Sequence, residues 1–294
     1  MDAHASILIT GGGGMLADAL KRALAARRRA FVAPPRGELD ITNDEQVRRA
    51  FRESRPTLVL NTAAHTKVDL CEEEPAKADE INGHAVGRLA AAAKEYGAKL
   101  LHVSTDFVFD GTSRRPYRED DPTNPLSAYG RSKLLGEQKL REVDPPGWLI
   151  VRTAWVYGPN GACFPRTMVN AAKAGKPLKV VDDQVGSPTY TRELADAILA
   201  LVDTGAAGVL NVANAGQVSW YGFTAAILEE FALKAELSAT TSAEWKKLRP
   251  NSAVRPAYSV LDTSKYTAAT GRRMRPWHEA LRDYRIAVEE NGGL

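Results

Sequence analysis

The chain has 294 residues, a formal net charge of +3 and 26% charged residues. This length supports one large domain or two smaller ones, and so small a net charge does not favour nucleic acid as a partner. No stretch reaches the ~18 apolar residues of a membrane span, and the first residues lack the basic-then-apolar pattern of a signal peptide. Only two cysteines occur, Cys71 and Cys163, far apart, which suggests neither a disulfide framework nor a metal cluster. We therefore expect a cytoplasmic protein that binds no membrane and no metal ion.

A strand and a glycine-rich turn open the chain. Residues 6–10 form a short β-branched run, Gly11 to Gly14 follow at once, and an apolar-periodic helix continues to about residue 26. Glycines let the backbone approach a phosphate closely, and a helix N-terminus offers free N–H groups and a favourable dipole. A glycine run alone can be a simple turn, but the strand before it and the helix after it favour a dinucleotide site.

The segment after the second predicted strand, residues 30–33, bears on the type of cofactor. A site that prefers NAD usually places an acid near the end of this strand to bind the ribose hydroxyls. Here no Asp or Glu occurs before Glu38, and Arg36 is placed to meet a 2′-phosphate. We predict NADP(H) as the preferred cofactor, with NAD(H) as a second one. Alternatively, Arg36 is an ordinary solvent-exposed loop residue that binds no cofactor.

Predicted strands and helices alternate through the first half of the chain. After the second strand come a helix at 43–53, a strand at 58–61, a helix at 82–96, a strand at 100–104, a helix from about 129 to 142 and a strand at 148–156. This alternation is typical of an α/β fold with a Rossmann-type, doubly wound parallel sheet.

The alternation loosens after residue 157. Predicted elements are a helix at 167–174, a strand at 178–181, a helix at 191–202, a strand at 209–213, and helices at 221–235 and near 277–289. We predict an NAD(P)-binding Rossmann domain at 1–157, with 190–213 rejoining it. Residues 158–189 and 214–294 would form a smaller C-terminal substrate-binding domain.

The stretch from residue 104 to 133 carries the candidate chemistry. Tyr129 and Lys133 are four positions apart, so on a helix they lie on one face, one turn apart. A neighbouring ammonium lowers the pKa of a phenol from its usual value of about 10, and such a tyrosine can give a proton to a developing alkoxide. Thr105 follows an apolar strand at the end where open α/β sheets bind ligands, and it can bond the same substrate oxygen. A Tyr-x-x-x-Lys pair by itself more often only covers a helix surface.

Seven segments spread along the chain share a further pattern. They are ITGGGGMLADAL at 9–20, NTAAHTKVD at 61–69, VSTDFVFDG at 103–111, NPLSAYGRSKLLGE at 124–137, VRTAWVYG at 151–158, DDQVGSPTYTRELA at 182–195 and RPAYSVLDTSK at 255–265. In its glycine turn and its Tyr-x-x-x-Lys pair, the chain resembles the extended short-chain dehydrogenase/reductase superfamily as a whole. In the segments VFDG, TAWVYG and DQVGSPT, it resembles one branch of that superfamily, the dTDP-4-dehydrorhamnose reductases.

The resemblance implies reduction of the C4 ketone of dTDP-4-dehydro-β-L-rhamnose to dTDP-β-L-rhamnose. By position, Tyr129 would be the acid, Lys133 would lower its pKa and hold the nicotinamide ribose, and Thr105 would orient the ketone. The other implied contacts are Gly11, Gly14, Met15 and Leu16 to the pyrophosphate, Asp40 and Ile41 to the adenine, Ala64, His65, Thr66 and Val103 along the cofactor channel, and Thr105, Asp106 and Trp155 to the sugar nucleotide.

Some features of the resemblance stay open. Certain relatives hold a magnesium ion between carboxylates at a dimer contact, but the comparable positions here are Ala19 and Arg192, so we predict no metal; a homodimer remains an alternative to a monomer. The candidates for the thymidine diphosphate site are Arg255, Lys173, Lys176, Trp220 and Phe164. Each of them is equally well explained as an ordinary surface charge or core aromatic residue.

Alternative functions are a reductase of another nucleotide 4-keto-6-deoxysugar and a non-catalytic NADP-binding regulatory subunit. The intact set of Thr105, Tyr129 and Lys133 argues against the regulatory subunit.

Overall fold

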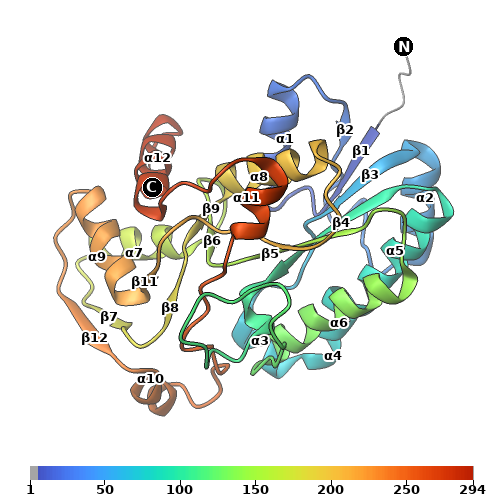
Figure 1. The fold of residues 1–294 in the computed structure, drawn as a ribbon. Helices are drawn as coiled ribbons and strands as arrows, with labels where there is room; N and C mark the ends of the chain where they lie inside the picture. The colour runs from blue at the N-terminus through green and yellow to red at the C-terminus, as the bar shows by residue number, and fades with distance from the viewer. Residues whose placement is uncertain (1–5, 294) are drawn as a thin grey trace.

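The computed structural model describes residues 6–293, and its centre is a six-stranded sheet in the order β10-β5-β4-β3-β1-β2 (Figure 1). Every neighbouring pair in this sheet is parallel. Its strands are β1 (Ser6–Thr10), β2 (Phe31–Val32), β3 (Pro56–Asn61), β4 (Lys99–Thr105), β5 (Leu149–Thr153) and β10 (Gly208–Asn211).

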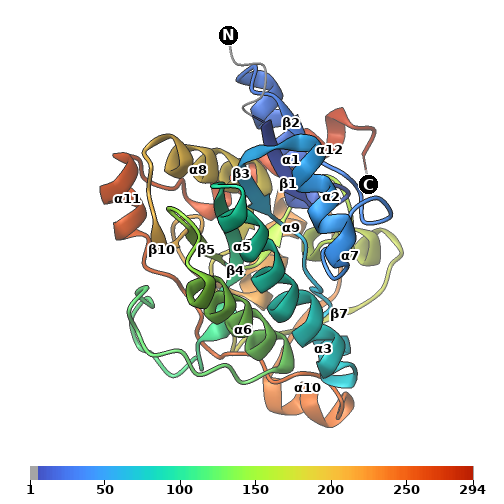
Figure 2. The same cartoon turned by 90° about the vertical axis from the view of Figure 1, so that its right-hand side faces the viewer.

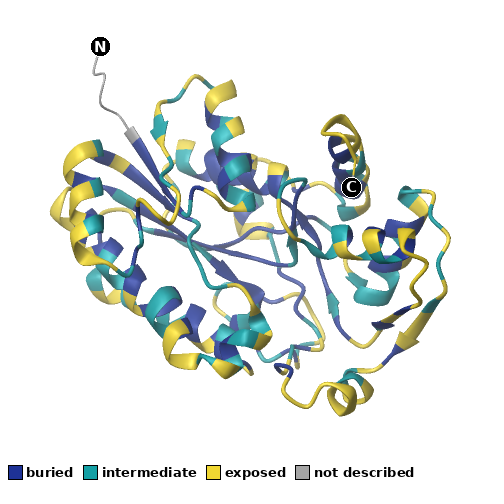
Figure 3. Ribbon diagram, turned by 180° about the vertical axis from the view of Figure 1, so that it is seen from behind, coloured by how far each residue is buried: buried dark blue, intermediate teal, exposed yellow. Residues whose placement is uncertain are grey.

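Helices cover both faces of this sheet, and alternate strand residues face two separate apolar cores (Figures 2 and 3). One face packs against α1 (Met15–Ala26), α8 (Thr191–Asp203) and α11 (Ser264–Thr270). The other packs against α2 (Asp44–Ser54), α5 (Ala85–Glu95) and α6 (Ala128–Val143). Strands buried on both faces read as continuous apolar runs, which is why the sequence shows them. The prediction of a doubly wound parallel sheet is confirmed.

The segment that contains α8 and β10 returns to this sheet from the second half of the chain. β10 pairs with β5 from Gly208 opposite Leu149 to Asn211 opposite Arg152. The exact boundaries of the two predicted domains stay a prediction.

The remaining elements form a smaller lobe, seen at the left of Figure 1. Its helices are α7 (Phe164–Lys173), α9 (Trp220–Glu230), α10 (Ser242–Leu248) and α12 (Trp277–Glu290). Its strands pair as β6 (Val156–Tyr157) with β9 (Thr189–Tyr190), β8 (Val185–Gly186) with β11 (Val218–Ser219), and β7 (Leu178–Val181) with β12 (Leu237–Thr240). Tyr157, Phe223 and Tyr284 are buried in its aromatic core.

Two predicted elements are interrupted in the structure. The strand expected at 148–156 splits into β5 and β6, because Trp155 adopts a left-handed φ of +47°. The helix expected from residue 82 is preceded by α3 (Val68–Glu73), α4 (Pro75–Asp79) and a π-helical turn, η1 (Glu80–His84). The turn lies where the side chain of Leu135 on α6 fills the space beside Gly83. Among residues 6–293, no helix is both long and apolar enough to cross a bilayer.

Candidate active site

Thr105 and Tyr129 meet where β4 ends and α6 begins. Thr105 is the last residue of β4, and Tyr129 lies in the first turn of α6, which Ser127 caps by accepting from the Gly130 N–H at 3.1 Å. A Cβ at Gly130 would clash with the Phe107 carbonyl oxygen, so glycine allows this turn to lie against the chain that leaves β4. The Thr105 hydroxyl lies close enough to the Tyr129 phenol to lower the pKa of that phenol. The structure therefore brings these two predicted residues together.

Lys133 lies in the same helix, but its amine is directed at β4. Nζ donates to the Val103 carbonyl at 2.7 Å and lies 3.2 Å from Nε2 of His102. Burial lowers the pKa of Lys133 to about 8, while Glu137 acts in the opposite direction. Burial also raises the pKa of Tyr129 above its ordinary value, with the neighbouring Thr105 hydroxyl opposing this. The lowering of the phenol pKa by Lys133 and the role of Lys133 in the reaction stay predictions.

Asp106 follows Thr105 and is almost completely buried. Its Oδ1 accepts from Thr105 Oγ1 at 2.9 Å, while its Oδ2 has no hydrogen-bond partner among the described residues. Burial raises the pKa of Asp106 to about 6, although the neighbouring Ser259 and Thr105 hydroxyls act to lower it. A buried acceptor without a partner is costly.

Trp155 stacks on Trp220, with ring centroids 3.5 Å apart and ring planes 5° apart. Its indole also lies against Gly186, where a Cβ would be 2.5 Å from the ring. Trp155 thus covers one face of the Trp220 indole, and Phe164 lies 4.3 Å from the same ring. Trp220 and Phe164 therefore pack, partly buried, against the aromatic core of the smaller lobe, and their contact with a base stays a prediction.

The glycine turn after β1 borders a cleft of about 410 Å³. Gly11 has a φ of +70°, a Cβ at Gly12 would clash with the Ala33 carbonyl, and the space beside Gly13 is open. Gly14 is the N-cap of α1 and provides no side-chain hydrogen bond to the helix end, so the first N–H groups of the helix can bind an anion. These features fit the diphosphate of a dinucleotide.

Besides Tyr129 and Lys133, the sequence analysis predicted eleven residues that bind the cofactor. Seven of these line the cleft: Gly11, Gly14, Arg36, Asp40, Ile41, Ala64 and His65. The other four, Met15, Leu16, Thr66 and Val103, do not. Thr105, Tyr129 and Lys133 do not line it either. The cleft therefore corresponds to the adenosine and diphosphate half of the proposed cofactor site.

Positive side chains surround the cleft. Arg36, Lys67 and Lys77 all line it, and Arg36 Nη2 lies 3.6 Å from a carboxylate oxygen of Asp40. Burial, and then Lys77, lowers the pKa of His65. The sequence analysis missed Lys67 and Lys77, because they follow β3 in a loop and a short helix that carry no local signal for phosphate binding.

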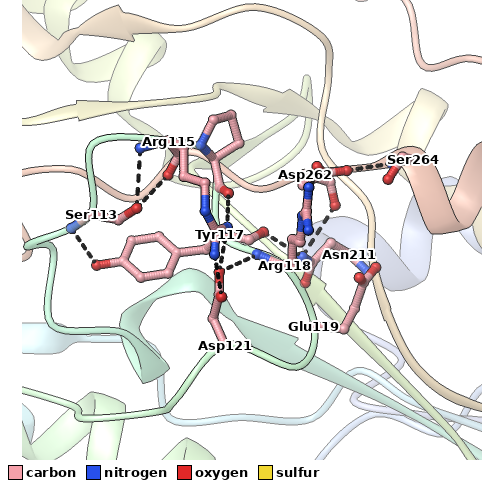
Figure 4. Close-up of polar contacts among 10 residues, drawn as sticks. Ser113, Arg115, Tyr117, Arg118, Glu119, Asp121, Asn211, Asp262 and Ser264 are labelled. Atoms are coloured by element: carbon pink, nitrogen blue, oxygen red, sulfur yellow. Dashed lines mark hydrogen bonds and ion pairs between the residues drawn. The ribbon is translucent and has the colours of Figure 1, made fainter.

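The loop between Thr105 and Tyr129 is anchored by polar contacts on several sides (Figure 4). Arg115 and Asp121 form an ion pair at 2.7 Å, and the Tyr117 carbonyl accepts from Asn211 Nδ2 at 2.9 Å. Glu119 Oε1 accepts from the Asn211 N–H at 2.9 Å. Because Asn211 ends β10, the loop is attached to the edge of the main sheet.

Of the charged candidates for a diphosphate, Arg255 is already paired. Its Nη2 lies 2.9 Å from Asp69 Oδ1, in the first turn of α3. Lys173 ends α7 and Lys176 lies just after it, and both are exposed.

The doubly wound sheet, the glycine turn at its first strand and the Thr105 and Tyr129 contact define a protein of the short-chain dehydrogenase/reductase class. The sequence profile of the RmlD substrate binding domain family matches residues 5–289, and the chain belongs to this family.

Named relatives agree with this family. A dTDP-4-dehydrorhamnose reductase of Streptomyces griseus is 42% identical over 286 residues, which cover 93% of this chain and 91% of the relative. A dTDP-4-keto-6-deoxy-D-glucose reductase of Streptomyces niveus is 39% identical over 93% of this chain and 94% of its own. The crystal structure of a dTDP-4-dehydrorhamnose reductase from Bacillus anthracis in complex with NADP superposes with a TM-score of 0.92, at 34% identity, over 96% of this chain and 99% of that one.

Proposed function

We propose that the protein is an NADP(H)-dependent oxidoreductase that reduces the C4 ketone of dTDP-4-dehydro-β-L-rhamnose to give dTDP-β-L-rhamnose. The observation that carries the proposal is that Tyr129 and Thr105 lie close together at the carboxyl end of β4. The relatives with printed reductase names cover nearly the whole chain, which supports the same substrate class.

The reduced nicotinamide would supply the hydride when bound, and the residues of this chain handle the oxygen and its proton. Tyr129 gives its phenol proton to O4, which needs a protonated phenol, and burial keeps it protonated at neutral pH. The Thr105 hydroxyl orients the same oxygen. Asp106 supports Thr105 from behind by accepting a hydrogen bond from its hydroxyl, and Trp155 packs against the sugar.

The cleft beside the glycine turn would hold the rest of the cofactor. The α1 N-terminus with Gly11 and Gly14 takes the diphosphate, and Arg36 with its neighbouring lysines favours the extra phosphate of NADP(H) over NAD(H). Residues 1–157 with 190–213 form the cofactor domain, and 158–189 with 214–294 bind the dTDP-sugar. Cys71 and Cys163 are free thiols, which suits a reducing cytoplasm.

The test is NADPH oxidation with the keto-sugar nucleotide as substrate. Tyr129→Phe should lower kcat by about 100- to 10,000-fold, because general acid catalysis contributes that range, while NADPH still binds. Tyr96→Phe, at an exposed tyrosine that ends α5, is the matched control and should keep full activity. A fully active Tyr129→Phe would contradict the assignment of the acid.

A second candidate is a reductase of another dTDP-4-keto-6-deoxysugar, favoured by the relative from Streptomyces niveus. Both candidates use the same residues, so turnover of each keto-sugar and NMR of the product separate them.

A further inference from the structure

A row of buried polar side chains crosses the main sheet at one register level. Thr10 on β1 pairs with Asn61 on β3, and Asn61 pairs with His102 on β4. All three are completely buried. Two residues earlier, the same three strands place Leu8, Val59 and Leu100 in the apolar core. Burying polar groups costs free energy that an apolar row would not, so the row calls for an explanation.

Hydrogen bonds fix the positions of the protons along this row. Asn61 Oδ1 accepts from the backbone N–H of Ala63 at 3.2 Å and from Thr10 Oγ1 at 2.6 Å. A backbone N–H can only donate, so the Asn61 amide cannot be turned round. Asn61 Nδ2 therefore donates to His102 Nδ1, 2.9 Å away. The single proton of the neutral imidazole is then on Nε2.

The proton on Nε2 of His102 points at Lys133. The distance from Nε2 to Lys133 Nζ is 3.2 Å, and Nζ also donates to the Val103 carbonyl at 2.7 Å. An ammonium has only donors and would meet this N–H unfavourably, whereas an uncharged amine has a lone pair that accepts it. The hydrogen-bond pattern thus favours the uncharged form of Lys133 more than solvent does.

Other groups near Lys133 permit an uncharged amine. Burial lowers the pKa values of both Lys133 and His102. Glu137, one turn along α6, favours the ammonium, but its carboxylate is already bonded to Arg152 and to Ser104. Burial raises the pKa of the Tyr129 phenol, one turn before, so this group stays neutral at pH 8, and the only charged group among the described residues that shifts the pKa of Lys133 is Glu137.

We propose that His102 is a positioning residue for Lys133, and that the row from Thr10 to His102 sets the direction of the lysine amine and weakens its hold on a proton before a cofactor binds. His102 holds the amine against the Val103 carbonyl at the base of the site. The effect on turnover rests on the proposed function, whereas the protonation state of Lys133 does not.

The first test is NMR titration of the cofactor-free protein labelled with ¹³C at the lysine ε-carbons, with Lys133→Met to assign the signal. Lys133 should titrate near pH 8, well below the ~10.4 of an ordinary lysine. In His102→Asn, the shorter amide still meets Asn61 but does not reach Lys133. The midpoint should then move up by about one pH unit, because the uncharged amine has lost its donor. A midpoint above pH 10 in the native protein, or an unchanged midpoint in His102→Asn, would overturn the proposal.

The second test uses a matched variant, His102→Gln, whose longer amide reaches the position of Nε2. His102→Asn should lower kcat by about tenfold, the size expected for a lost hydrogen bond, and His102→Gln should recover most of it. Equal losses in both variants, at equal stability to urea, would show that His102 only packs the core. The titration needs no substrate, so a failure of the proposed function leaves the first test valid.

Discussion

At the scale of single residues, Asp106 is the carboxyl group whose surroundings most oppose its charge. Burial raises its pKa from an ordinary 3.8 to about 6, although the neighbouring Ser259 and Thr105 hydroxyls act to lower it. Below about pH 4 the group is protonated in the folded and unfolded chains alike. Between about pH 4 and 6 only the unfolded chain releases the proton, so stability falls as the pH rises through this window.

Asp106→Asn should remove this dependence on pH. The variant should gain up to ~3 kcal/mol in free energy of unfolding relative to the native protein as the pH rises from 4 to 7. Urea unfolding at a series of pH values measures the difference. A constant difference across the series would show that Asp106 has an ordinary pKa.

Arg36 tests the choice between the two nicotinamide cofactors. Its side chain is 72% exposed and borders the cleft, so its replacement should not disturb the fold. Arg36→Ala should raise KM for NADPH by about tenfold, the size of a lost charge-assisted hydrogen bond, and leave KM for NADH nearly unchanged. Arg49→Ala, at an exposed arginine on α2, is the control. Equal changes for both cofactors would mean that Arg36 does not meet the 2′-phosphate.

At the scale of elements, glycine sets how closely α6 approaches the end of β4. A Cβ at Gly130 would clash with the Phe107 carbonyl oxygen, which belongs to backbone and cannot turn away. Gly87 on α5 is a matched helical glycine, because an added Cβ would have no atom nearer than Lys139 Cβ, 3.3 Å away. The two sites differ in the neighbour that must move, not in helix propensity.

Gly130→Ala should therefore destabilise the protein by about 1–3 kcal/mol through overpacking and lower kcat, because it separates Tyr129 from Thr105. Gly87→Ala should be neutral or stabilising by up to about 1 kcal/mol, since alanine favours a helix. Urea unfolding and NADPH oxidation measured on both variants check this. Similar behaviour of the two variants would contradict a close approach at Gly130.

The sequence predicted most elements of the main sheet, because strands buried on both faces and amphipathic helices have strong local patterns. It did not predict the π-helical turn η1, which depends on packing against α6, or the break at Trp155, whose left-handed backbone a tryptophan does not favour. The Tyr129 and Lys133 pair was visible as a helical spacing. The Thr10, Asn61 and His102 row was not, because it depends on which strands are neighbours.

At the scale of the whole molecule, an ion pair joins the C-terminal segment to α3, which follows β3 of the main sheet. Asp69, in the first turn of α3, accepts from the Ala253 N–H at 3.0 Å and pairs with Arg255 Nη2 at 2.9 Å. The partners are 186 residues apart in sequence, so no local pattern could predict the contact. Arg255 is also the candidate for the substrate diphosphate, and the two roles make different predictions.

If Arg255 leaves Asp69 to bind the diphosphate, Arg255→Met should raise KM for the sugar nucleotide by about tenfold or more, since a charge-assisted hydrogen bond is lost. NADPH affinity should stay unchanged. Asp69→Asn frees Arg255 from its carboxylate, so KM should stay the same or fall. If the ion pair only joins the two parts of the chain, both variants should raise KM alike and lose stability alike. Steady-state kinetics and urea unfolding of both variants distinguish these outcomes, because exposed ion pairs contribute at most about 1 kcal/mol to stability.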